Sequence, residues 1–365
     1  MSSGLHTLSA QVADAGGGNP SPGLNPISGR LTLDEGWAPY AQATVVLPLP
    51  TPDILALLDP RRQQVKMYLD ASALFGSNPS SMHWIAYLRS RTIDRAAQTC
   101  TITVASGEAV LQDYKQTSAI PVDPGTTSLR VLVAYILATV IPYTTLGGTA
   151  DAVIDQPTAF WNPGVSAWAY VQTFVQKAGL RLWCDEYGIW SLDVSTPNDL
   201  VGNLVLSTTD SITGLEDAIN RDGDEWYDSV IVVYSWTDAA GVQQIQADTA
   251  TVPGYSKALT IDVSAPYPGP GAASAVLSRA IGKGNIVTPR AVSDYDARPG
   301  MDVSVTDQES NTLAGAVSSI EWAFPGHEMD VKIRNILEIT PYSWRALATG
   351  ITWSASPAGG TWANE

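Results

Sequence analysis

The chain has 365 residues and a net charge of −16, with 36 acidic and 20 basic side chains. An acidic surface with scattered basic residues repels a phosphate backbone, so we expect no nucleic-acid binding. The length suits two or three domains, and the 15% of charged residues lies well below the roughly 25% of an ordinary soluble domain.

This low charge content predicts a surface of Ser, Thr, Gly, Asn, Gln and aromatic groups. Such a surface suits a protein that other protein chains largely cover. It suits equally well a soluble β-protein rich in Ser and Thr, and the composition does not separate the two interpretations.

Cysteine usage and hydropathy add two expectations. Cys100 and Cys184 lie in apolar, strand-like stretches, which favours buried free thiols over a disulfide. The longest charge-free apolar run, residues 131–143, is shorter than the roughly 18 residues of a membrane span. No basic-then-apolar leader opens the chain, so we expect synthesis in the cytoplasm and no membrane span.

The first predicted element is an N-terminal arm, residues 1–29. Its second half, residues 14–29, is rich in Gly and Pro, which resist both helix and sheet. We therefore expect a flexible segment.

Residues 30–120 predict an antiparallel β-domain. From Arg30 the hydrophobic pattern has a period of two residues, which is typical of half-buried strands. Cys100, Ile102 and Val104, for example, alternate with threonines that point to the opposite face.

A helical insertion is predicted at 121–180. Apolar residues recur at helical spacing over 129–140 behind the possible N-cap Ser128. A second helix is predicted at 166–178, where Gly179 marks its C-terminal end.

The strand pattern returns in residues 181–345. Apolar alternation on both sides of 185–188 predicts a hairpin with a four-residue turn, and Pro325-Gly326 predicts a type II turn between two further paired strands. The other predicted elements are a helix at 272–283 and strands at 228–236, 243–251, 257–263, 301–306, 315–323 and 329–340. The fold class is therefore mainly β (α+β), with two β-rich modules around a helical insertion.

The last predicted segment is a C-terminal tail, residues 346–365, which has no periodicity. Trp353 and Trp362 are its candidate anchors on a partner, because Trp concentrates at the centres of interfaces. The alternative is that both pack on the chain's own core.

The sequence has no signature of catalysis or of cofactor binding. His6, His83 and His327 are far apart and lack neighbouring ligands at zinc spacing, and nucleophile-elbow, Walker and dinucleotide motifs are missing. Residues 220–225 resemble only half of a calcium loop. We therefore expect no enzyme, no cofactor and no metal.

Carboxylate pairs and aromatic residues leave one competing function open. Adjacent acids such as Asp185 and Glu186, Glu216 and Asp217, or Asp294 and Asp296 are no evidence that a pair flanks a sugar. The 12 Trp and 14 Tyr could serve carbohydrate binding, although aromatic residues more often fill a β-core.

Three stretches resemble the minor tail proteins of siphophages that infect actinobacteria, in particular those of the baseplate or tail-tip hub type. The first is Arg30–Ala43, a strand, a turn shaped by Asp34 and Pro39, and a second strand. The second is Gly107–Tyr114. The third is Tyr295–Val303, which is similar to the RPGD turn of these hubs, although Met301 stands where an acidic residue is common.

The resemblance extends over roughly residues 28–340 and implies two antiparallel β-barrel-like modules with helical parts between them. It further implies a homotrimeric ring in the virion, at the end of the tail tube. The partners implied are a distal tail protein, the tail tube, a central fibre and the tape-measure protein, and no catalytic residue is carried over. The alternatives are a hexameric distal tail ring protein and a carbohydrate-binding or receptor-binding tail protein.

Overall fold

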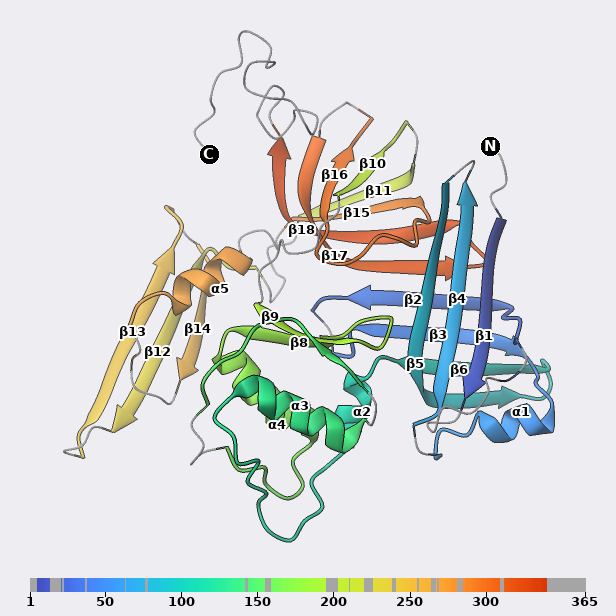
Figure 1. Cartoon of the computed structure of the whole chain (residues 1–365). Coiled ribbons are helices and arrows are strands. Elements are labelled where there is room, and N and C mark those ends of the chain that lie inside the picture. Colours follow the sequence, from blue (N-terminus) through green and yellow to red (C-terminus); the bar gives the residue numbers. More distant parts are fainter. Residues whose placement is uncertain are drawn as a thin grey trace. The chain divides into compact units, whose positions relative to one another are not determined.

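The computed structural model shows a mainly β chain, with 51% of its described residues in strands and 15% in helices (Figure 1). This confirms the predicted mainly β class. The structure describes residues 5–13, 21, 23–36, 38–62, 64–75, 78–141, 144–154, 159–194, 203–209, 211–219, 226–237, 241–254, 256–263, 267, 269–280, 285–308 and 312–339.

The chain forms two compact units. The first contains residues 1–199, 291–300 and 318–330, and the second contains residues 200–290, 301–317 and 331–365. The first unit therefore joins residues that the sequence analysis divided among the first β-domain, the helical insertion and the start of the second β-domain.

The first unit is built on an antiparallel sheet with the strand order β1-β4-β5-β6-β3-β2-β17. Alternate residues of its strands are buried, as in β3, where Ala41, Ala43, Val45 and Leu47 face the core. The strands are β1 (Leu5–Ala13), β2 (Ser28–Asp34), β3 (Ala41–Pro48), β4 (Lys66–Phe75), β5 (Asn78–Asp94), β6 (Thr99–Ala105) and, from Ser318 on, β17 (Thr312–Phe324). The helix α1 (Pro52–Leu57) follows β3. The predicted period-two pattern is thereby confirmed in the strands, whereas residues 52–57 and 108–113 of the predicted β-domain form helices.

The N-terminal segment is more ordered than predicted. β1 pairs along its whole length with β4, and its residues Leu8, Ala10 and Val12 are buried. Leu24 then returns to the free edge of β1 and forms an isolated bridge with Ala10. The prediction of a flexible arm is wrong for Leu5–Ala13, because apolar alternation here is matched by a partner strand more than fifty positions away.

The helical part of the first unit shares one core with a hairpin. α2 (Glu108–Asp113), α3 (Leu129–Val140) and α4 (Ala167–Lys177) pack with β7 (Leu146–Gly147), β8 (Leu180–Cys184) and β9 (Trp190–Val194). Buried Trp161 and Trp190 are the largest members of this core. The two predicted helices and the predicted N-cap Ser128 are confirmed, since Ser128 accepts a bond from a backbone N–H of the first turn. Ser166, which was not predicted as a cap, does the same for α4.

The second unit contains two sheet regions. In one, β10 (Asn203–Ser207) runs parallel to β16 (Asp302–Thr306), and β16 pairs with the start of β17. In the other, β12 (Ser229–Thr237) lies between β13 (Gln243–Thr251) and β14 (Ala258–Val263). The remaining elements are β11 (Ile212–Ile219), α5 (Ala272–Ala280), β15 (Asn285–Val292) and β18 (Glu328–Ile339).

Two predicted details differ from the structure. Gly326 does not have the positive φ that a type II turn requires, and the Phe324–Pro325 bond is cis, so the turn between β17 and β18 is of another type. Among the described residues the strand order is open, and no closed barrel is observed.

Candidate functional site

The three sequence motifs meet in the first unit along β8 and at the turn that joins it to β9. Tyr40 comes from the first motif, Glu108 from the second and Arg298 from the third. Each contacts a residue of the hairpin, within Arg181–Glu186. We call these contacts the hairpin cluster.

The centre of the hairpin cluster is an ion pair between Arg298 and Glu186, joined through Nε and Oε1. The two side chains are only 14% and 5% exposed. The Arg298 Nη1 also donates to the carbonyls of Tyr295 and Ala297, at 2.6 and 2.8 Å. Burial alone would lower the pKa of Arg298, but Glu186 raises it, so the guanidinium stays charged and ties the third motif to the hairpin.

The first motif joins the cluster through Tyr40. This residue follows the β2–β3 turn, in which Asp34 accepts a 2.8 Å bond from the Gly36 N–H, as the predicted turn role of Asp34 requires. Arg181 of β8 lies over the Tyr40 ring, 5.6 Å from its centre. Burial, followed by the charge of Glu186, raises the pKa of the Tyr40 hydroxyl, so the phenol is neutral at physiological pH.

The second motif joins the cluster through Glu108, in the first turn of α2. Its buried carboxylate accepts a 2.8 Å bond from the Cys184 backbone N–H at the end of β8. Burial raises the pKa of both Glu108 and the Cys184 thiol. Gly107 precedes Glu108 because a Cβ there would lie 2.8 Å from the Trp190 ring.

Asp185 opens the hairpin turn and holds it closed. Its Oδ1 accepts bonds from the N–H groups of Tyr187 and Ile189, at 2.9 and 2.8 Å, and the Asp185 N–H bonds to the Ile189 carbonyl. The predicted hairpin with its four-residue turn is thereby confirmed. Burial, and secondarily Glu186, raises the pKa of Asp185 to about 6.

We expect Asp185 to make the fold more stable in mild acid than at neutral pH. The Asp185 carboxyl binds its proton more tightly in the folded chain than in the unfolded chain, where its pKa is 3.8. The contribution of this proton to the free energy of unfolding is therefore full below about pH 4 and is lost as the pH rises through about 6. Asp185→Asn keeps the acceptor oxygen but cannot ionise. Melting curves of both proteins from pH 4 to 8 should show that the free energy of unfolding of the variant rises relative to that of the natural chain by on the order of 1 kcal/mol as the pH rises. A difference between the two proteins that does not depend on pH would contradict this assignment.

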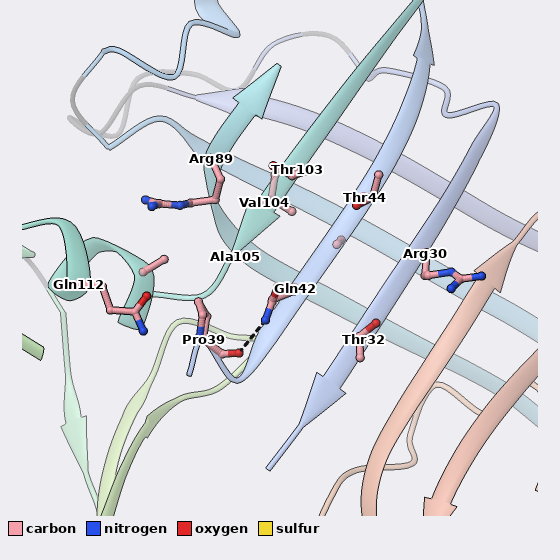
Figure 2. Close-up of a pocket in the computed structure, with 12 residues that line it drawn as sticks. Arg30, Thr32, Pro39, Gln42, Thr44, Arg89, Thr103, Val104, Ala105 and Gln112 are labelled. Carbon is pink, nitrogen blue, oxygen red and sulfur yellow. Dashed lines mark hydrogen bonds between the residues drawn. The ribbon is translucent and has the colours of Figure 1, made fainter. Parts of the chain in front are cut away.

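A polar pocket of about 440 Å³ lies on the outer face of the antiparallel sheet on which the first unit is built (Figure 2). Its floor comes from β2, β3 and β6, and α2 closes one end. No residue of the lining is acidic. The lining residues are Arg30, Thr32, Pro39, Gln42, Ala43, Thr44, Arg89, Thr103, Val104, Ala105, Ala109 and Gln112.

The structure brings some candidate residues together and leaves others apart. Asp185 and Glu186 lie in the hairpin cluster, whereas Asp294 accepts a bond from the Asp296 N–H within a turn. His83 pairs with Asp70, 2.5 Å between Nδ1 and Oδ1. Trp353, Trp362 and residues 220–225 lie outside the described residues.

The described part of the chain has neither a cluster of metal ligands nor a membrane-crossing helix. That part contains no group of three or more His, Cys, Asp or Glu side chains placed to hold a metal ion. None of its helices has the length and hydropathy of a membrane crossing. Cys100 and Cys184 are buried and free, as predicted.

The fold is similar to those of solved tail proteins. The match with a tail protein from Neisseria meningitidis covers 90% of this chain and 96% of that protein, with a TM-score of 0.56 and 13% sequence identity. The match with the prophage MuSo2 tail protein from Shewanella oneidensis covers 90% of this chain and 98% of that protein, with a TM-score of 0.58 and 13% sequence identity. The match with a prophage tail protein from Listeria monocytogenes covers 90% of this chain and 94% of that protein, with a TM-score of 0.55 and 10% sequence identity.

These likenesses define a class of fold, the one that these three tail proteins share. No protein-family model matches the sequence, and no curated protein matches it. At such low identity the likeness concerns the fold and not the residues of any site.

Proposed function

We propose that this chain is a structural component of a bacteriophage tail tip, a minor tail protein of the baseplate-hub type. The observation that carries the proposal is the likeness of fold, which extends over 90% of this chain and at least 94% of each of three tail proteins. The order of the three hub-like motifs supports it independently of the fold.

The hairpin cluster supports a structural role more than a catalytic one. Glu186 and Arg298 pair with each other, Glu108 and Arg298 bond to backbone groups, and Glu186 and Glu108 are buried. A general acid or base must reach its substrate, which the buried Glu108 and Glu186 do not. We therefore propose that the cluster fixes the hairpin to the sheet, and that the protein is not an enzyme.

The proposed hub is a homotrimeric ring at the end of the tail tube, connected to a central fibre or spike, and part of the virion. Closed rings of identical chains are a common way to use up exposed interaction surfaces. The small charged fraction agrees with a surface that neighbouring tail proteins cover. The proposed neighbours are the distal tail protein, the tail tube and the tape-measure protein.

Light scattering after size exclusion tests the ring. Three copies of the 38.7-kDa chain give about 116 kDa and six give about 232 kDa. If the protein is a trimeric hub, we expect the mass of three copies over a range of concentrations. The second mass would contradict the hub and favour a distal tail ring.

A carbohydrate-binding or receptor-binding tail protein remains a second candidate, because of the 12 Trp and 14 Tyr. Four of the described Trp residues do not favour it, since Trp84, Trp161, Trp190 and Trp322 are fully buried. A glycan array separates the candidates. Specific retention of one glycan, lost on replacing an exposed aromatic residue, would support carbohydrate binding.

A further inference from the structure

We infer that the two free edges of the β13-β12-β14 sheet join copies of this chain head to tail, with β13 of one copy against β14 of the next. Among the described residues, no strand pairs with the outer side of β13 or of β14 (Figure 1). The inference rests on the proposed ring, because it names the contact between neighbouring copies.

The outer side of β13 carries a row of backbone groups that can receive another strand. Just beyond β13, the Val252 N–H donates to the Asp228 carbonyl at 2.9 Å, and bonded residues alternate along an antiparallel ladder. Every second residue of β13 therefore bonds to β12. The residues between them direct their N–H and C=O groups outward, where no described residue bonds to them: Gln243, Ile245, Ala247, Thr249 and Thr251.

The outer side of β14 carries a shorter row of the same kind. The Ser229 N–H donates to the Lys257 carbonyl, and β14 runs parallel to β12 in an unbroken register. Alternate residues of β14 therefore bond to β12. The outward residues are Ala258, Thr260 and Asp262.

The directions of the two edge strands suit a ring of copies. β13 runs antiparallel to β12, and β14 runs parallel to it. Rotation of a copy about an axis along the strands preserves these directions, so its β14 lies antiparallel to β13 of the neighbouring copy. Pairing of β13 with β13 would instead give a two-fold contact and leave β14 open.

The β13 edge lacks the devices that usually keep an edge strand from pairing. Such devices are Lys or Pro residues, bulges and covering segments. β13 has no Lys, Arg or Pro, and its register with β12 is unbroken over nine residues. Its outward residues are all exposed, Ile245 to 71%. The edge of β1, by contrast, is covered by Leu24.

Charge favours a second copy as the partner at these edges. The chain carries a net charge of −16, so its copies repel each other where acidic side chains meet. Of the five outward residues of β13 and the three of β14, only Asp262 is charged. Asp248 of β13 faces α5 instead, where it accepts bonds from the Gly271 and Ala273 N–H groups at 2.9 Å.

The two faces of the sheet also continue across the contact. The outward residues of β13 and β14 have exposed side chains on the face away from α5, whereas Ala250 and Leu259 pack in the core that contains Leu277 of α5. Residues directly opposite each other in an antiparallel pair share a face. The contact therefore keeps the α5 side of one copy next to the α5 side of the other.

The length of the edges leaves three registers that use all of β14. In these registers Thr260 lies opposite Ile245, Ala247 or Thr249 of the neighbouring copy. Opposite residues of a bonded pair have Cα atoms about 5.5 Å apart, which a disulfide can bridge. Within one copy Thr260 and Thr249 lie on either side of Ile231, about 10 Å apart, so no disulfide can form there.

Engineered disulfides in the full chain test the inference. Thr260→Cys is combined in turn with Ile245→Cys, Ala247→Cys and Thr249→Cys, and each protein is oxidised and run on a non-reducing gel. We expect one of the three to give covalently linked trimers, and each single variant to remain unlinked. Gln246→Cys with Thr260→Cys is the matched control, because Gln246 is exposed but lies on the α5 face. The natural Cys100 and Cys184 are buried and do not compete.

Ala247→Pro tests the backbone bonds of the contact. The Ala247 N–H points outward, so proline removes no bond to β12, and edge strands tolerate proline at such a position. We expect association to weaken at least about tenfold in light scattering on dilution, whereas Ala247→Val, which keeps the N–H, should assemble normally. Circular dichroism checks that both variants fold, and equal association of the folded variants would contradict the contact.

Absence of crosslinks in all three double variants would overturn the inference. A covalent dimer of Ala247→Cys alone would also overturn it, because this product indicates pairing of β13 with itself. Native mass separates this failure from failure of the hub. A mass of three 38.7-kDa chains without crosslinks would leave the ring intact and move its contact elsewhere, whereas a monomer would contradict the ring as well.

Discussion

Replacing Arg298 with Ala is expected to lower the free energy of unfolding by about 3–5 kcal/mol. The change removes the partner of the Glu186 carboxylate, whose side chain is only 5% exposed. A buried charge without its partner costs far more than the intact pair contributes. The third motif also loses its bonds from Arg298 Nη1 to two backbone carbonyls.

Two comparisons make this result interpretable by urea unfolding. Arg89→Ala removes an arginine from a pair whose Asp113 side chain is 62% exposed, and should cost less than about 1 kcal/mol. Combining Arg298→Ala with Glu186→Gln should recover part of the loss, because no buried charge remains. If the single and double variants are equally unstable, the buried charge is not the cause.

Replacing Gly148 with Ala is expected to destabilise the first unit by more than about 3 kcal/mol. Gly148 has a φ of +73°, and a Cβ there would lie 2.2 Å from the carbonyl oxygen of Leu192 in β9. That oxygen belongs to backbone, so the strand itself would have to move. Because β9 forms the hairpin with β8, the change should disturb the hairpin cluster as well.

Gly125→Ala provides the control for the backbone conformation. Gly125 has a similar φ of +67°, but nothing lies within 4 Å of a Cβ at this position. The cost there is only that of a left-handed conformation, about 1–2 kcal/mol. Thermal unfolding of both variants measures the difference, and equal losses would show that contact with Leu192 is not responsible.

Locally encoded elements could be predicted from the sequence. α3 and α4 each combine an apolar stripe with a serine N-cap, and α4 is followed by Gly179 at a φ of +68°. The β8–β9 turn follows from Asp185 and Gly188, which supply a side-chain acceptor and a positive φ. Each of these signals acts over a few neighbouring residues.

Elements that depend on distant partners could not be predicted. β1 is a strand because β4 and Leu24 satisfy its backbone groups, and no local pattern in residues 5–13 identifies those partners. α2 is short and lies within a motif that the sequence pattern located but could not assign to a helix.

The candidate site follows the same rule. The motifs pointed to Tyr40, Glu108 and Arg298 separately, but only the fold brings them to one hairpin. Arg89 of the pocket gave no signal at all, because it lies in a β-bulge, which is a property of how β5 pairs with β6. Pairing between distant strands depends on packing that one sequence does not reveal.

The location of the chain in a virion is the most direct test of the proposed function. Phage particles whose genome encodes this chain would be purified, probed with gold-labelled antibodies raised against it, and viewed by electron microscopy. We predict gold at the far end of the tail, away from the capsid. Particles that lack the chain by mass spectrometry, or that carry gold on the capsid alone, would contradict the proposal.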